Sequence, residues 1–201
     1  RLALSVISVI NDSGTNLIGA FMGISFFISM WVMNTSTTLM LLPICLAICS
    51  NIKDSLSVIP KKEFNNFEIA LLLGIAYAAS IGGMSSLVGT APNIVFAGFM
   101  QENFSTEISF LGWMKVALPI GLIMLITTFV ILTKFIYPSN FKFNLAARKK
   151  IYLTLNKLGP MSKDEKKVLL VFIITALLWV TRKYLNEYNI FTGLTDAGIA
   201  I

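Results

Sequence analysis

The chain consists of long apolar segments separated by short polar runs. Residues 67–100, 110–137 and 168–183 are mainly apolar, and two shorter apolar arms, 17–31 and 39–49, flank a run of amide and hydroxyl side chains. A transmembrane helix needs about 20 apolar residues. The pattern therefore predicts an all-α polytopic membrane protein in which the longer segments are transmembrane helices.

The polar run at 34–38, Asn-Thr-Ser-Thr-Thr, lies at the centre of the first of these regions. Neither apolar arm beside it carries a charge, and neither is a comfortable full span. A polar centre between two short arms favours a re-entrant helical hairpin over 17–49, with its tip inside the bilayer. Irregular backbone is tolerated there only against protein or a water-filled cavity. The alternative is one long helix whose polar residues hydrogen-bond to neighbouring helices.

The segment 67–100 is too long for one simple span and is interrupted near its middle. Three glycines and a proline release the helical backbone there: Gly82, Gly83, Gly89 and Pro92. Four side chains supply oxygen atoms: Ser85, Ser86, Thr90 and Asn93. We predict a broken helix, with one half at 67–81, an unwound loop, and a second half at 91–100. The alternative is a kinked continuous helix whose glycines allow close packing.

The distribution of charged residues predicts which side of the membrane each loop faces. Residues 138–167 contain eight lysines and arginines against two acidic residues. Basic residues collect in the cytoplasmic loops of membrane proteins, so this segment is expected to be cytoplasmic or interfacial. The span 110–137 then places the acidic loop 101–109 outside, and the broken helix returns the loop 50–66 to the cytoplasm. The hairpin accordingly enters the membrane from the cytoplasmic side.

The remaining segments are expected to be helix ends. Residues 1–10 have the character of the end of a helix, and 195–201 that of the start of another. Both termini fall inside apolar runs, which indicates a piece of a larger protein. Ser162 and Glu165 have the spacing of a capping box at the start of the helix that contains 168–183.

Composition supports the membrane location and narrows the chemistry. The chain is 56% hydrophobic and 13% charged, whereas soluble domains are about 25% charged. The net charge of +6 is explained by cytoplasmic loops, so no nucleic-acid partner is expected. The absence of histidine removes the commonest metal ligand and proton relay at neutral pH. Cys45 and Cys49, four residues apart, are expected to be small packing residues.

Two interruptions rich in hydroxyls and exposed backbone form the pattern that transporters use to build a site near the bilayer midplane. Amide groups at a broken helix suit an anion, and carbonyl and side-chain oxygens suit a hard monovalent cation such as sodium. The apolar cores of these segments carry no charge. Binding of an anion there depends on a co-bound cation, which is a physical route to coupling.

Two other classes of protein use similar features. The pore of a channel would also contain broken helices, and saturable, cation-coupled transport separates a carrier from it. An intramembrane enzyme would need a nucleophile or metal set at the midplane. The apolar segments contain neither histidine nor a buried lysine or acid for this purpose. The residues alone therefore argue against an enzyme and leave a carrier and a channel open.

Two long motifs resemble signature sequences of the divalent anion:sodium symporter (DASS) family of di- and tricarboxylate carriers. Residues 29–43 resemble the first signature of the family, and 74–93 is similar to its broken fifth helix. Shorter matches occur at 161–166, 178–179 and 195–197. The resemblance runs in one register over nearly the whole chain, and it implies a transporter, not an enzyme.

The resemblance also implies roles for individual residues. Asn34, Thr35 and Thr90 match positions that contact the substrate carboxylate. Ser29, Asn34 and Gly89 match positions that give oxygens to a sodium ion. No other cofactor is implied.

Met33 departs from the family pattern, which has a serine at this position. Because hard cations prefer oxygen ligands, a thioether cannot replace the hydroxyl, and only the backbone carbonyl of Met33 is expected to serve. The leading hypothesis is a secondary active transporter of small di- or tricarboxylates, such as succinate or malate, coupled to sodium. The alternatives within the family are a sodium-independent exchanger, which Met33 would accommodate, and a sulfate carrier.

The resemblance further implies that the chain is half of an inverted-repeat, elevator-type transporter in the plasma (inner) membrane. The intact protein would be a homodimer in the lipid bilayer. Residues 11–100 would belong to the moving transport part. The spans 110–137 and 168–183 would connect this part or act as its scaffold.

Overall fold

The computed structural model describes residues 13–53, 60–139, 161–187 and 198–199, and all regular secondary structure in this part is helical. The all-α fold that the apolar pattern predicts is confirmed. The helices are α2 (Gly14–Ser29), α3 (Asn34–Lys53), α4 (Lys61–Met84), α5 (Ala91–Phe104), α6 (Phe110–Val130), the π-helical η1 (Ile131–Ile136) and α8 (Lys163–Glu187). The expected helix end at 1–10 and most of the basic segment 138–167 lie outside the described residues, as does all of 195–201 except the two helical residues 198–199.

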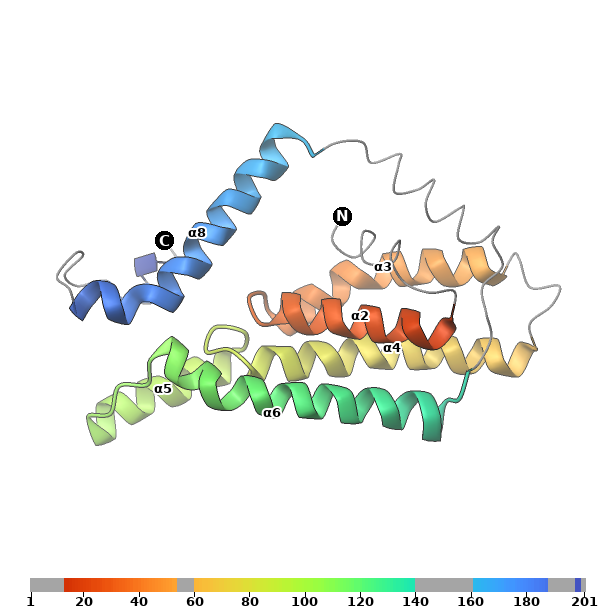
Figure 1. Cartoon of the computed structure of the whole chain (residues 1–201), viewed down its shortest axis with the longest axis horizontal. Coiled ribbons are helices and arrows are strands. Elements are labelled where there is room, and N and C mark those ends of the chain that lie inside the picture. Colours follow the sequence, from red (N-terminus) through yellow and green to blue (C-terminus); the bar gives the residue numbers. More distant parts are fainter. Residues whose placement is uncertain (1–12, 54–59, 140–160, 188–197, 200–201) are drawn as a thin grey trace.

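Helix α4 is the centre of the bundle, because it packs against α2, α3 and α6 (Figure 1). Its contact with α2 is close and partly polar. Gly74 faces the side chain of Met22, and the hydroxyl of Ser25 donates a hydrogen bond of 2.8 Å to the carbonyl oxygen of Ile75. In a bilayer, small residues and interhelical hydrogen bonds of this kind hold helices together, since lipid tails are as apolar as the side chains themselves.

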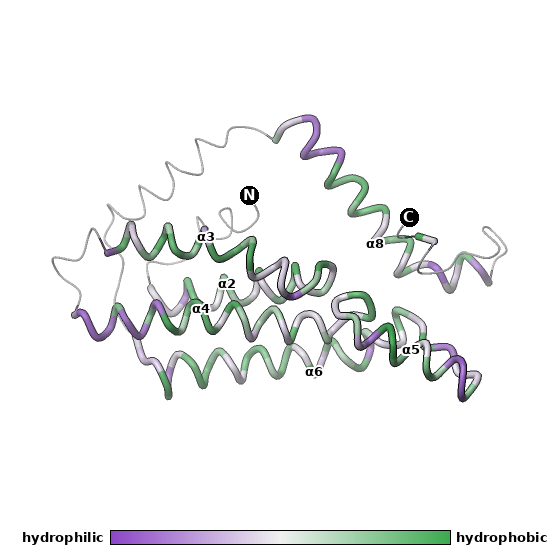
Figure 2. The backbone as a smooth tube through the Cα atoms, turned by 180° about the vertical axis from the view of Figure 1, so that it is seen from behind, coloured by the Kyte–Doolittle hydropathy of each residue, from purple (hydrophilic) through white to green (hydrophobic). Residues whose placement is uncertain are grey.

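Two described helices, α4 and the joined α6–η1 helix, are long and apolar enough to cross a membrane. Figure 2 shows hydrophobic residues along most of α6, whereas α4 and α8 each begin with a hydrophilic stretch. Many large apolar side chains of α6 are exposed, among them Val116, Ile123 and Ile126. Such a surface suits contact with lipid or with further protein.

The connection between α2 and α3 is shorter and less polar than expected. Backbone N–H groups of Trp31 and Val32 still donate to the carbonyl of Ile28 at 3.0 Å, so the turn occupies only 30–33. The polar run 34–38, expected at the centre of the hairpin, instead forms the first turns of α3. Side chains of this type favour helix starts because their oxygens bond nearby backbone groups.

Helix α4 continues to Met84, three residues beyond the predicted end of its first half at Ile81. The prediction that Gly82 and Gly83 unwind the backbone is wrong, because both lie inside the helix and provide space for a neighbour. A Cβ at Gly82 would lie 2.2 Å from the carbonyl oxygen of Phe26 in α2. The unwound loop covers 85–90, and α5 begins at Ala91.

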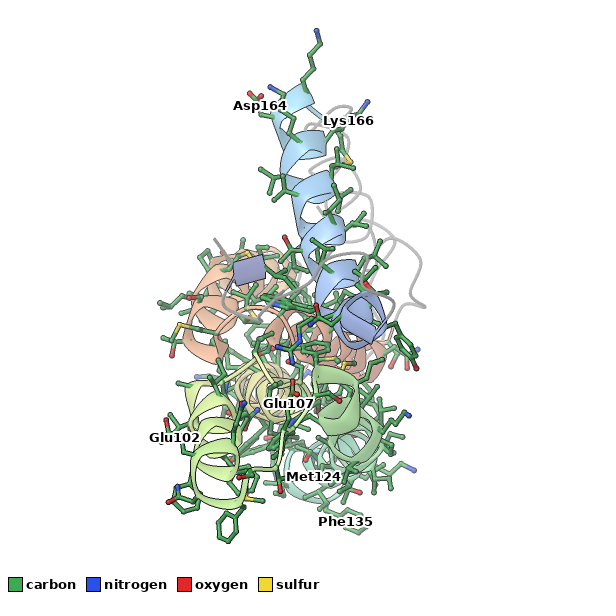
Figure 3. The ribbon with its side chains drawn as sticks, turned by 90° about the vertical axis from the view of Figure 1, so that its left-hand side faces the viewer. Glu102, Glu107, Met124, Phe135, Asp164 and Lys166 are labelled. Carbon is green, nitrogen blue, oxygen red and sulfur yellow. The ribbon has the colours of Figure 1, made fainter. Side chains whose placement is uncertain are left out.

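Helix α8 begins with the predicted capping box, which is confirmed. The backbone N–H of Ser162 donates to Glu165 Oε2 at 2.8 Å, and the N–H of Glu165 donates to Ser162 Oγ at 3.1 Å. This end of α8, with Asp164 and Lys166, points away from the other helices (Figure 3). The box satisfies two donors that the first turn of a helix leaves without partners.

The other half of α8 contacts the turn 30–33 and the start of α6 through aromatic rings. Trp179 stacks on Trp31 and on Phe110, with ring centroids 6.5 and 6.1 Å apart, and Trp31 stacks on Phe110 at 5.8 Å. Arg182 forms an ion pair with Glu107 beside these rings. We call Trp31, Phe110 and Trp179 the aromatic stack.

Candidate functional site

The turn 30–33 and the loop 85–90 meet at the same end of α2 and α4 (Figure 1). The hydroxyl of Ser86 donates a hydrogen bond to the carbonyl oxygen of Met30, which joins the two connections directly. Each connection leads into the N-terminus of a helix, α3 after the turn and α5 after the loop. Two helix starts are therefore brought to one place.

Asn34, the first residue of α3, is held between α2 and α4. Its Oδ1 accepts a hydrogen bond of 2.7 Å from the hydroxyl of Ser29, which is fully buried. On the other side, a Cβ at Gly83 would lie 2.0 Å from the same Oδ1. Only glycine therefore allows the Asn34 amide to approach α4 this closely.

Oxygen atoms also converge at Gly89 in the loop. A Cβ there would lie 2.5 Å from the carbonyl oxygen of Gly83 and 2.8 Å from the carbonyl oxygen of Ser29. The structure thus brings Ser29, Asn34 and Gly89 together, all three of which the resemblance assigns to a sodium ion. The oxygens belong to carbonyl, amide and hydroxyl groups without formal charge, and such donors suit a hard monovalent cation better than a transition metal.

Charged or soft metal ligands do not gather in the described ranges. No group of three or more histidine, cysteine or acidic residues there is placed to hold a metal ion. Cys45 and Cys49 are buried thiols in α3, as expected for packing residues.

The backbone carbonyl of Met33 has one hydrogen bond. It accepts from the N–H of Thr37 at 3.0 Å, as in the first turn of a helix, and a carbonyl oxygen has a second lone pair that can coordinate a cation. The Met33 side chain is 64% exposed. Most of the Met33 side chain therefore lies outside the packing between the two connections.

The residues expected to contact a carboxylate lie at the two helix starts. Thr35 is exposed in the first turn of α3, and Thr90 is partly exposed in extended conformation immediately before α5. The hydroxyl of Thr90 makes no capping hydrogen bond to its own helix. The first N–H groups of a helix lack intrahelical partners and carry the positive end of its dipole, so both helix starts favour an anion.

Two buried side chains, Ser86 and Asn93, hold the turn 30–33, the loop 85–90 and the end of α4 together by hydrogen bonds that the sequence does not indicate. Ser86 Oγ accepts a 3.0 Å hydrogen bond from the N–H of Gly89 while it donates to Met30. Asn93 Nδ2 donates to the carbonyl oxygens of Gly83 at 3.1 Å and Ser86 at 2.8 Å. The sequence marks Ser86 and Asn93 only as sources of oxygen, whereas Asn93 acts here through its nitrogen.

An all-α protein with two interrupted, apolar helical regions that meet in an uncharged, oxygen-lined place has the architecture of a membrane transporter. The family model described as the sodium:sulfate symporter transmembrane region matches residues 1–201, and the chain belongs to this family. The predicted membership of the anion:sodium symporters is confirmed. The chain accordingly derives from an integral membrane protein.

The chain is similar to the sodium-dependent dicarboxylate transporter SdcS of Staphylococcus aureus, in strain USA300 and in strain NCTC 8325. Each is 34% identical over 203 residues, a match that covers 100% of this chain and 39% of the relative. The chain thus spans about two fifths of the length of the curated relatives it matches. The family and both relatives are described as transporters, and none is described as an enzyme.

Proposed function

We propose that this chain forms part of a sodium-coupled carrier of small dicarboxylates such as succinate and malate. The observation that carries the proposal is the convergence of Ser29, Asn34 and Gly89 at the starts of two helices. The name of the similar relatives, a sodium-dependent dicarboxylate transporter, supports both the ion and the class of anion.

The sodium ion is bound by oxygens of Ser29, Asn34 and Gly89, with the backbone carbonyl of Met33 as a further ligand. The hydrogen bond from Ser29 to Asn34 Oδ1 fixes the orientation of the amide, with its oxygen between Ser29 of α2 and Gly83 of α4. None of these residues has an acidic side chain, so the protein supplies no fixed negative charge to balance the sodium ion. A bound anion can supply the balancing charge instead.

The dicarboxylate supplies that charge. One of its carboxylates is bound by Asn34, Thr35 and Thr90, by backbone N–H groups at the start of α3 and by the N–H of Ala91 at the start of α5, where Pro92 has no N–H. Sodium and the anion then stabilise each other, and coupling between two ligands of this kind is reciprocal. Asn34 contacts both ligands and is the residue through which the coupling acts.

A sulfate carrier is the second candidate, because the family description names sulfate. A third candidate is a sodium-independent exchanger, which the exposed Met33 thioether favours, since it replaces a hydroxyl ligand. The three candidates differ in the ions that their transport requires.

The proposal extends to the membrane setting. The hairpin formed by α2 and α3 is re-entrant, and α4 and α5 are the two halves of a broken transmembrane helix. Residues 50–66 and 138–167, the first of which includes the end of α3 and the start of α4, face the cytoplasm. In the plasma (inner) membrane the intact protein is an inverted-repeat homodimer that works by an elevator motion.

Uptake into proteoliposomes that contain the full-length protein tests this proposal. Labelled succinate is followed with an inward sodium gradient, with potassium instead, and with liposomes preloaded with dicarboxylate. A symporter takes up succinate only with sodium, and Asn34→Ala abolishes the uptake. Uptake that needs preloading and no sodium identifies an exchanger, and uptake of sulfate in place of succinate identifies a sulfate carrier.

A further inference from the structure

We infer that Ser86 and Asn93 are positioning residues that fix the turn 30–33 and the loop 85–90 as one hydrogen-bonded unit, and that this unit sets the affinity for sodium. The inference deepens the proposed function and rests on it for the role of the ion. The hydrogen bonds themselves are independent of any ligand.

Ser86 joins the two connections through a single hydroxyl. A serine hydroxyl has one hydrogen to donate and two lone pairs to accept. The hydrogen goes to the carbonyl of Met30, the residue that directly follows α2, and a lone pair accepts the N–H of Gly89. Ser86 is fully buried and Met30 is 4% exposed, so water cannot easily replace the serine.

Asn93 joins the two sides of the helix break. It lies in the first turn of α5, is buried, and uses both hydrogens of its amide nitrogen, one on Gly83 in α4 and one on Ser86 in the loop. The reverse orientation of the amide would set its oxygen against two carbonyl oxygens, so the partners determine which atom is nitrogen.

These hydrogen bonds act on the groups that surround the candidate cation site. The N–H of Gly89 is held by Ser86, and the carbonyl of Gly83, which lies beside Gly89, is held by Asn93. Neither Ser86 nor Asn93 belongs to the proposed sodium ligands. Loss of either side chain therefore leaves the ligands present but releases the segment that carries Gly89.

The first test is hydrogen exchange of the full-length protein in lipid nanodiscs. Ser86→Ala leaves the Met30 carbonyl and the Gly89 N–H without their shared partner, and the backbone amides of 30–33 and 85–90 are expected to exchange about tenfold faster in both segments. Ser80→Ala is the matched control, because Ser80 is exposed and bonds only within its own helix, to the carbonyl of Ala76. Faster exchange in the loop alone, or in neither segment, would overturn the inference.

The second test is sodium-dependent uptake by the same variants. Ser86→Ala is expected to raise the half-saturating sodium concentration about tenfold, with less than about a twofold change in the maximal rate at saturating sodium. Ser86→Thr keeps the hydroxyl and is expected to restore the wild-type sodium dependence. A fall in maximal rate with an unchanged sodium dependence would contradict the positioning role.

Asn93→Ala provides an independent variant should Ser86→Ala not fold. It is expected to accelerate exchange in 85–90 and to raise the half-saturating sodium concentration, whereas Asn103→Ala, at an exposed asparagine of the same helix, is expected to change neither. Wild-type uptake without any sodium requirement would refute the proposed function. The exchange measurement would still decide whether Ser86 and Asn93 join the two connections.

Discussion

At the scale of residues, the central feature is the amide of Asn34. It accepts a hydrogen bond from Ser29 in α2 and touches Gly83 in α4, so one side chain links three helices. Both neighbours are suited to this contact, since Ser29 supplies a donor and Gly83 supplies space. The proposed coupling of ion and anion depends on this placement.

Gly83→Ala tests the placement. The added methyl would lie 2.0 Å from Asn34 Oδ1, so the asparagine or the helices must shift, and overpacking of this kind costs about 1–3 kcal/mol. We expect a lower thermal midpoint and a loss of sodium-dependent uptake. Gly98→Ala is the control, because nothing lies within 4 Å of its Cβ and alanine stabilises a helix by up to about 1 kcal/mol. Equal behaviour of the two variants would show that Asn34 does not need this space.

The sequence predicts part of this residue-scale picture. The resemblance selects Ser29, Asn34 and Gly89, and the structure brings these three together. The resemblance does not select Gly83, because the residue that needs the space beside Gly83 is Asn34, which belongs to a different helix. The donor role of Asn93 is hidden for the same reason, since an amide can donate or accept and only its neighbours decide which.

At the scale of elements, the apolar pattern predicts the helices better than their ends. Glycine has two uses in a helix, to release the backbone and to admit a close neighbour, and the sequence alone does not separate them. Gly82 serves the second use, against the carbonyl of Phe26, and α4 therefore runs past it. The capping box of α8 is predictable because both of its residues are local.

Ser162→Ala tests the capping box. The N–H of Glu165 loses its acceptor, and loss of an N-cap side chain typically costs about 1 kcal/mol. We expect the amides of the first turn of α8 to exchange about fivefold faster, which corresponds to that free energy. Uptake should be unchanged, because the residue lies at the far end of α8 from the aromatic stack. Unaltered exchange in this turn would mean that packing, not the cap, holds the helix start.

At the scale of the whole molecule, the aromatic stack joins α8 to the turn that precedes Asn34. The predicted spans indicate neither this contact nor the ion pair of Arg182 with Glu107, because both form between segments far apart in the chain. If the hairpin moves against a scaffold that includes α8, as the proposed elevator motion requires, the stack must separate in each transport cycle.

A cross-link across the stack tests that motion. Cysteines at Trp31 and Trp179, in a full-length protein without Cys45 and Cys49, are joined by a short bifunctional reagent that can be cleaved by reduction. We expect uptake to fall about tenfold or more when they are joined and to return on cleavage. The control pair, Phe99→Cys with Phe104→Cys, has rings 6.0 Å apart within α5 and should have no effect when joined. Full uptake while positions 31 and 179 are joined would show that transport does not require the aromatic stack to separate.

The most direct test of the account is the affinity of the full-length protein for succinate as a function of sodium concentration, measured by equilibrium titration in detergent or nanodiscs. The account predicts a dissociation constant that falls as sodium rises, by about 5–150-fold between zero and saturating sodium. Potassium should have no such effect, and Asn34→Ala should remove the dependence. The same dissociation constant in sodium and in potassium would contradict the claim that ion and anion bind together where the two connections meet.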